Sequence, residues 1–176
     1  MCENLEMIGN WQIAKHTEPM RYIEYAKAYL QASTDMCLRM KDNVSNRTWP
    51  NACVVMMLAA HSVELFLKGA ILVKEPKADF VHHRLEALEV SYRVAYPNSE
   101  FRFDVPFKTE QLGMTETEIE ALKKDYPLPS ILFRYPVRKP GDEWEGFHGF
   151  DPQGFLCILD SLSEDYGRVL KKIGNI

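Results

Sequence analysis

Hydrophobic positions recur at helical spacing in the N-terminal part of the chain. From about Pro19 to Lys41, apolar and tyrosine side chains follow one another at intervals of three and four residues, which is the repeat of one helix face. Thr17 is placed to cap this helix, and Pro19 suits its first turn. The face includes Tyr22, Tyr25 and Tyr29, and each hydroxyl needs a partner, so it is expected to be partly wet or paired with polar groups.

A second helix is predicted from about Pro50 to Lys74, after a polar loop at Asn43–Trp49. Its residues are apolar on almost every side, which is typical of a central helix that is buried by its neighbours. A third helix is predicted from about His83 to Tyr96, because Leu85, Leu88 and Tyr92 share one face and a proline follows.

The stretch at 98–151 is predicted to be mostly irregular. Alternating aromatic and polar residues at 101–107 favour a short extended piece, and Thr115 with Glu118 has the spacing of a capping box that opens a short helix to about Asp125. The following segment is rich in proline and glycine, and Ile131–Tyr135 is predicted to pair with Trp144–Phe147 in a small hairpin.

The last helix begins at Asp151 as cap and Pro152 in its first turn, and it keeps helical spacing to the end of the chain. Residues 1–176 are therefore interpreted as a single domain with an N-terminal extension at 1–16. The predicted fold is all-α: an antiparallel up-and-down bundle of four to five helices, with the proline- and aromatic-rich insertion before the final helix.

Composition and charge narrow the function classes. The 176 residues carry 21 Lys and Arg against 25 Asp and Glu, a net charge of −4, which argues against a general electrostatic nucleic-acid binder but leaves room for a local basic patch. The first residues are acidic, and the longest uninterrupted apolar run, at 52–60, is much shorter than a membrane-spanning helix needs. A cytoplasmic protein without a membrane contact is expected.

The four cysteines give no support for a disulfide framework or a zinc site, because none of them forms a C-x-x-C pair. Three of them, Cys37, Cys53 and Cys157, fall in helical apolar patterns, and they are predicted to be buried, reduced thiols.

Three ionisable residues lie on one stripe of the otherwise apolar second helix. His61, Glu64 and Lys68 are spaced at i, i+3 and i+7, so they share a face. Because an unpaired buried charge is unfavourable by several kcal/mol, they must pair or line a cleft. We favour a structural ion pair at the bundle seam or at the rim of a dimer interface; a catalytic or binding role and a solvent-facing stripe are the alternatives.

Other chemistry on this helix has less support. A metal site is disfavoured, since the order His61-x-x-Glu64 occurs once and Lys68 would repel a dication. Ser62 and His61 are adjacent in the helix and so do not form a nucleophile–base pair. His82 and His83 stand at the entry to the third helix and are candidate site residues if that helix folds back. No nucleotide-binding or metalloprotease motif occurs, so no cofactor is expected.

A basic stretch in the insertion is the candidate binding segment. Arg134, Tyr135, Arg138 and Lys139 lie among aromatic residues, a combination that can stack on and neutralise RNA or a nucleotide. We favour the alternative, a loop held by aromatic packing with Arg134 paired to an acidic group, because the acidic residues at 142, 143 and 145 weaken the local field.

Three segments of the chain resemble proteins of the HEPN-domain superfamily. The strongest match is Leu58–Leu72, LAAHSVELFLKGAIL, which is similar to the central helix of that family with its Glu-Leu-x-Leu-Lys sequence. His83–Leu88, HRLEAL, and Phe133–Pro136, FRYP, are similar to segments that follow it. The resemblance covers about Tyr22–Tyr96. It implies an all-α bundle that usually dimerises, in prokaryotic toxin–antitoxin, antiphage or nucleotidyltransferase-linked systems.

The resemblance also implies a ribonuclease in many members, whose hallmark is an arginine followed by a histidine after four to six residues. No arginine here is followed by a histidine at that spacing. The first hypothesis is therefore a non-catalytic, homodimeric binding or partner subunit, with the dimer face on the aromatic sides of the first and last helices. The second is a metal-independent endoribonuclease with an atypical site, Arg134 with His148 or His61 with His82 or His83. A nucleotide pocket around the polar stripe is the third.

Overall fold

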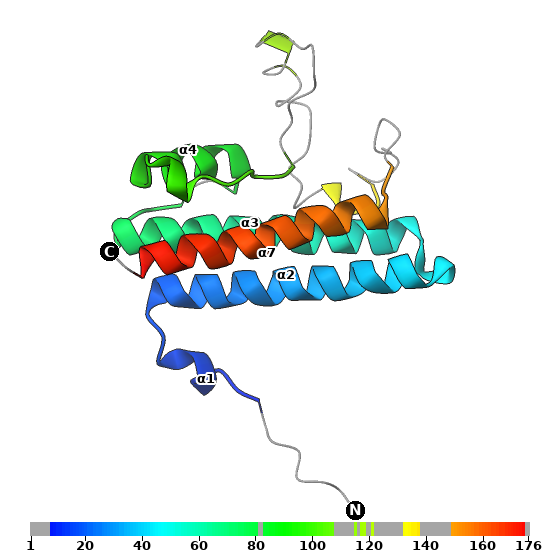
Figure 1. The fold of residues 1–176 in the computed structure, drawn as a ribbon, viewed down its shortest axis with the longest axis horizontal. Coiled ribbons are helices and arrows are strands. Elements are labelled where there is room, and N and C mark those ends of the chain that lie inside the picture. Colours follow the sequence, from blue (N-terminus) through cyan, green and yellow to red (C-terminus); the bar gives the residue numbers. More distant parts are fainter. Residues whose placement is uncertain are drawn as a thin grey trace, which may run out of the picture.

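The computed structural model describes residues 8–80, 83–107, 115, 117–118, 121, 132–137 and 149–174. Within these residues the chain is helical, without a strand, which confirms the all-α class. The elements are α1 (Trp11–Ala14), α2 (Glu18–Asp42), η1 (Val44–Asn46), α3 (Trp49–Lys74), α4 (Leu85–Ala95), η2 (Ser99–Phe101) and α7 (Pro152–Ile173). Figure 1 shows α2 and α3 as a long antiparallel pair, α7 running antiparallel to α2 across them, and α4 on the α3 side.

The first predicted helix is α2. It buries one stripe, which comprises Ile23, Ala26, Leu30, Ser33, Cys37 and Met40, as the periodicity predicts. Thr17 occupies the N-cap position, but its side chain makes no capping hydrogen bond. The preceding segment is held instead by Arg21, whose guanidinium donates to the backbone carbonyls of Ala14 and His16, both at 3.0 Å.

The central helix α3 is buried on most of its sides. It begins one residue before Pro50, and the Thr48 hydroxyl caps it by accepting from the Asn51 N–H. By length and composition α3 is long and apolar enough to cross a membrane, which the sequence analysis did not foresee. However, 72% of its apolar window is buried inside the bundle, as in the core helix of a globular protein.

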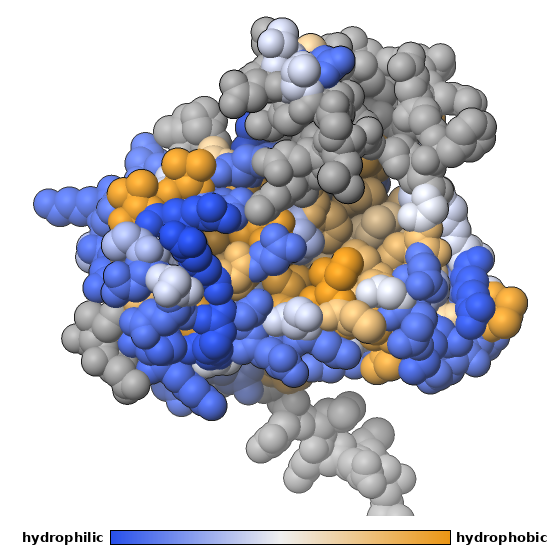
Figure 2. All heavy atoms as spheres, turned by 45° about the horizontal axis from the view of Figure 1, so that its top comes forward, coloured by the Kyte–Doolittle hydropathy of each residue, from blue (hydrophilic) through white to orange (hydrophobic). Residues whose placement is uncertain are grey.

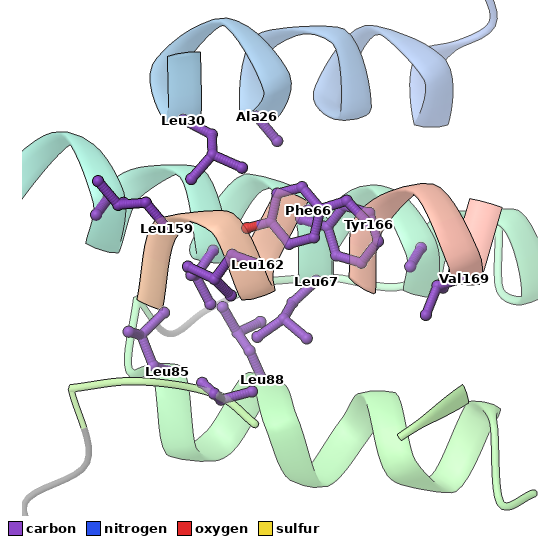
Figure 3. Close-up of a cluster of buried hydrophobic side chains, with 14 of the residues drawn as sticks. Ala26, Leu30, Phe66, Leu67, Leu85, Leu88, Leu159, Leu162, Tyr166 and Val169 are labelled. Atoms are coloured by element: carbon purple, nitrogen blue, oxygen red, sulfur yellow. The ribbon is translucent and has the colours of Figure 1, made fainter. Parts of the chain in front are cut away.

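Side chains from all four long helices meet in one core (Figure 3). Phe66 of α3 stacks on Tyr166 of α7 with parallel rings and centroids 3.8 Å apart. The buried Ser62 hydroxyl donates to the Ala26 carbonyl at 2.7 Å and lies 3.3 Å from the Tyr166 hydroxyl, so these polar groups are satisfied within the core. Ser62 is fully buried and has no access to a substrate.

The helix caps of the C-terminal half follow the sequence. Asp151 caps α7 by accepting from the N–H groups of Gln153 and Gly154, as predicted. Thr115 and Glu118 form the reciprocal hydrogen bonds of the predicted capping box, whereas the end of that helix near Asp125 lies outside the described residues.

One of the two expectations for the insertion at 98–151 is corrected. The piece predicted to be extended at 101–107 begins in η2, and Arg102 after it has extended backbone, but the segment pairs with no strand. Phe101 and Val105 are buried while Arg102 and Asp104 between them are exposed, as the alternation predicts. Residues 132–137 also contain no strand, so this arm of the predicted hairpin is wrong, and the other arm, Trp144–Phe147, lies outside the described residues. Aromatic packing of these segments onto the bundle replaces sheet pairing.

Hydrophobic side chains also reach the surface. On the face of the molecule that carries α4 and α7, they gather near the centre, with hydrophilic residues to the left, to the right and below (Figure 2). Val90 and Val94 of α4 are among the exposed large hydrophobic residues.

Candidate functional site

Four of the six candidate site residues meet at one carboxylate. Lys68 Nζ donates to Glu64 Oε1 at 2.7 Å, and His83 Nδ1 lies 2.8 Å from the same oxygen. His61 Nδ1 lies 3.7 Å from the other oxygen, Oε2. The i, i+3 and i+7 spacing on α3 brings His61, Glu64 and Lys68 together. The fold adds His83 from the connection before α4.

Burial decides the character of this cluster. Glu64 and Lys68 are only 5% and 6% exposed. Burial alone would raise the pKa of Glu64, but the contacts from His61, Lys68 and His83, together with the charge of Lys68, outweigh it and lower the pKa to about 2. Glu64 is therefore an anion at neutral pH, and its main partner is the buried ammonium.

The connection between α3 and α4 closes over this ion pair. The Phe80 ring lies 5.6 Å from Lys68 Nζ in cation–π geometry. His83 is at the surface, with 65% of its side chain exposed. Because an ionised carboxylate only accepts hydrogen bonds, Nδ1 of His83 must carry a proton and donate it to Glu64.

His61 is the second imidazole on the carboxylate. Its side chain is 33% exposed, and its ring packs edge-on against Tyr29 with centroids 4.6 Å apart. The cluster thus presents two surface-accessible histidines on either side of one buried anion. This arrangement orients imidazoles, and chemically it can move protons.

Of the remaining candidates, the structure describes Arg134, which is not part of the cluster. Arg134 lies beside Val54 near the start of α3, and Glu64 is ten residues further along the same helix, about 15 Å at 1.5 Å per residue. Arg134 and Glu64 therefore do not share a site. His82, Arg138, Lys139 and His148 lie outside the described residues.

A groove follows the α2–α3 seam. One cavity of about 360 Å³ is lined by Arg21, Tyr22, Tyr25, Tyr29, His61 and Leu65. A second, of about 580 Å³, is lined by Ala32, Asp35, Met36, Arg39, Met40, Asn46, Asn51 and Leu58. Along each of the two helices, the residues that line the cavities are mainly three, four or seven positions apart in the sequence. Both cavities therefore lie on the same face of the α2–α3 pair. From Tyr22 to Met40 this face is about 27 Å long.

The tyrosines expected at a dimer face behave differently on the two helices. Tyr25 of α2 is 52% exposed and lies in the α2–α3 groove, in agreement with a partly wet face. Tyr166 of α7 is in the core, and burial raises its pKa far above the usual range. The last helix therefore presents no exposed tyrosine, and the expected aromatic face is confined to α2.

A third cavity, of about 300 Å³, lies where residues 132–137 meet the first turns of α3. Its lining includes Trp49, Cys53, Phe133, Arg134 and Tyr135. Phe133 packs on Phe107 with centroids 6.0 Å apart, so aromatic packing holds this loop. The predicted acidic partner of Arg134 is not found: in the described part of the chain no carboxylate pairs with it.

The thiols divide into three environments. Cys37 is buried, and burial together with the charge of Asp151 raises its pKa to about 11. Cys53 is half-buried, and burial raises its pKa as well. Cys157 is exposed, so the prediction of a buried thiol is wrong there. Among the described residues no three His, Cys, Asp or Glu side chains are placed to hold a metal ion.

Sequence reasoning missed two features of these sites. The ring contact between Tyr29 and His61 joins the polar stripe to the groove. Trp49 and Cys53 complete the cavity at Arg134, although they are distant from it in sequence.

Comparisons with protein-family models, with curated proteins and with solved structures find no match.

Proposed function

We propose that this protein is a HEPN-like, non-catalytic binding subunit that acts as a homodimer in a prokaryotic toxin–antitoxin, defence or nucleotidyltransferase-linked system in the cytoplasm. The observation that carries the proposal is the groove along α2 and α3, one part of which is lined by Tyr22, Tyr25 and Tyr29. The all-α bundle and the Glu-Leu-Phe-Leu-Lys sequence of α3 are consistent with the resemblance that suggests this class.

The size of the groove suits a second copy of the chain. It is about 27 Å long and two helices wide, about 20 Å, so two such faces in contact bury about 1,000 Å² in total. This area is at the lower end of what specific interfaces use. Half-exposed aromatic side chains with a polar rim are the residue types that such interfaces favour.

The charges along α2 define a register for the pair. When two α2 helices pack antiparallel about a two-fold axis, the residue numbers of any two positions that face each other add up to the same value. An axis beside Ala28 places Arg21 opposite Asp35 of the second copy, and it places Arg39 one residue from the position opposite Glu18. Both pairs join opposite charges, and each occurs twice in the dimer, so this register is electrostatically complementary.

The buried ion pair supports a non-catalytic role. The ammonium of Lys68 is bound to Glu64 and covered by Phe80, so it is not available to a phosphate. Arg134, the other candidate cation, lines a cavity with Val54, which is about 15 Å along α3 from Glu64.

A second candidate function, a metal-independent endoribonuclease, is favoured by the two imidazoles on Glu64. Strand cleavage by proton transfer needs one general base and one general acid, and His61 and His83 are accessible groups of the right type. Incubation of purified protein with tRNA and mRNA tests it. Cleavage that His61→Ala and His83→Ala both abolish would establish this function over the first, and intact RNA is the result that the first predicts.

Sedimentation velocity tests the proposed dimer. The wild-type protein is expected to sediment as a dimer at micromolar concentration, and Tyr25→Glu as a monomer, because it places a charge in the groove. Val90→Glu is the matched control: it adds the same charge at an exposed position of α4, outside the groove, and should stay dimeric. A monomeric wild-type protein would reject the proposal.

A further inference from the structure

The segment before α2 carries large apolar side chains that the bundle does not bury. Residues 8–16, the N-terminal arm, include α1 and project from the start of α2 (Figure 1). Ile8 is 84% exposed and Trp11 is 58% exposed, and α1 buries none of its residues. An exposed tryptophan close to an exposed isoleucine is typical of a segment that packs on another molecule.

Two contacts hold the N-terminal arm in place without a partner. The Arg21 guanidinium donates to the backbone carbonyls of Ala14 and His16, both at 3.0 Å. A Cβ at Gly9 would collide with the Trp11 ring, so one face of the indole lies on the backbone of this glycine. The ring is therefore already oriented, which lowers the entropy that docking would cost.

The larger cavity of the α2–α3 groove matches an indole in size and chemistry. Its volume of about 580 Å³ is within the range of small-molecule sites, and its lining includes Met36, Met40 and Leu58. Methionine sulfur makes favourable contacts with aromatic rings. Asn46 and Asn51 also line the cavity, and each donates its side-chain N–H to a nearby backbone carbonyl, at 3.4 and 2.8 Å.

These two amides leave acceptors for the indole N–H. Among the described residues, nothing donates to the side-chain oxygen of Asn46 or Asn51. A tryptophan that is buried in an interface needs a partner for its single N–H donor. The cavity thus offers both an apolar surface for the ring and a partner for its polar edge.

Arg21 connects the N-terminal arm with this cavity in the proposed dimer. In the proposed register it faces Asp35 of the second copy, which lines the cavity there. Trp11 is three residues from Ala14, so it lies within about 10 Å of the contact with Arg21. The first cavity residue of its own α2, Ala32, is about 17 Å along the helix from Arg21. The cavity within reach is therefore that of the second copy.

We propose that the N-terminal arm of each copy docks on the other, with the Trp11 ring in the larger groove cavity and its N–H directed at Asn46 and Asn51. The inference rests on the proposed dimer and names the contact that completes its interface. Each exchanged ring buries about 150–250 Å². Two of them raise the interface from about 1,000 Å² into the range of specific, stable complexes.

Photo-cross-linking identifies the neighbour of this ring directly. A photo-reactive benzoylphenylalanine is placed at position 11, and this chain is mixed with isotope-labelled wild-type chain so that mixed dimers form. After irradiation, mass spectrometry is expected to find residue 11 joined to labelled peptides that contain Met36, Met40 or Leu58. The same photo-reactive residue at position 90, which is exposed on α4, should not reach these peptides.

The affinity of the dimer is the second measurement. Trp11→Ala removes an exposed side chain, so each subunit should keep its fold, which circular dichroism checks. The dissociation constant of the dimer should rise about thirtyfold or more, as for other tryptophans that anchor an interface. Val90→Ala is the control: it shortens an exposed side chain on α4 and should leave the constant unchanged. Sedimentation velocity over a concentration series measures both variants.

The outcomes separate this inference from the dimer itself. A monomeric wild-type protein rejects both. A dimer in which residue 11 cross-links only to its own chain, or to peptides of the second copy outside the cavity, overturns the exchange of arms and leaves the dimer intact. An unchanged dissociation constant in Trp11→Ala does the same.

Discussion

Lys68 Nζ donates a hydrogen bond to Glu64 Oε1 at 2.7 Å, one turn earlier on α3, at a point where both residues are about 95% buried. Two charges that are removed from water in this way stabilise the fold only as a pair. Each therefore depends on the other, and the surrounding contacts from His83 and Phe80 depend on both.

Removing one charge of this pair is expected to be strongly destabilising. Glu64→Gln leaves the Lys68 ammonium buried without a counter-charge, and the free energy of unfolding should fall by about 3–5 kcal/mol. The double variant Glu64→Leu with Lys68→Met should recover most of that loss, because it removes both charges. Urea denaturation of the three proteins measures this. Equal losses in the single and double variants would contradict the pairing.

The same carboxylate predicts a dependence of stability on pH. The pKa of Glu64 is lowered from 4.5 to about 2 in the folded protein, so its contribution is present above pH of about 4.5 and is lost as the pH falls towards 2. The shift corresponds to about 3 kcal/mol. Unfolding free energies measured across this range should fall less steeply in the Leu/Met double variant, which lacks the group. Parallel curves would show that Glu64 does not titrate in this way.

Two glycines in helices should respond to alanine in opposite directions. A Cβ at Gly69 would lie 2.8 Å from Ile23 Cγ1 and 3.0 Å from the Pro19 carbonyl oxygen, where α2 and α3 approach closely. Gly69→Ala should therefore destabilise by about 1–3 kcal/mol. A Cβ at Gly167 meets nothing within 4 Å, and Gly167→Ala should stabilise by about 0.5–1 kcal/mol. Thermal unfolding of both variants measures the two changes in stability.

The hydroxyl of Tyr166 should matter less than its ring. Tyr166→Phe removes the contact with Ser62 but keeps the stack on Phe66, so about 1 kcal/mol is expected to be lost. Tyr166→Leu removes the stack as well and should be worse by a further 1 kcal/mol or more. If both variants unfold at the same denaturant concentration, the stack contributes nothing beyond burial.

The helices were readable from the sequence because the signals were local. The stripe of α2, the cap at Asp151 and the stop after Lys74 each depend on residues a few positions apart. The insertion was not readable in the same way. Alternation at 101–107 predicted a short extended piece but not the turn of η2 at its start, where Phe101 packs on Tyr96 and its carbonyl accepts from the Tyr92 hydroxyl.

Only part of the polar cluster could be predicted from the sequence. Spacing alone placed His61, Glu64 and Lys68 on one face, but the arrival of His83 depends on how the α3–α4 connection folds back. The position of Arg134 beside Trp49 is a contact between segments more than 80 residues apart, which no periodicity contains. Such contacts are set by packing of the whole chain.

The register of the proposed dimer is tested most directly by a charge swap. Arg21→Glu should dissociate the dimer, because it faces Asp35 of the second copy, and Asp35→Arg should do the same through Arg21. The two positions lie about 21 Å apart along one α2, too far to contact within a subunit. In sedimentation velocity the double variant should sediment as a dimer again. A double variant as monomeric as either single variant would contradict the account.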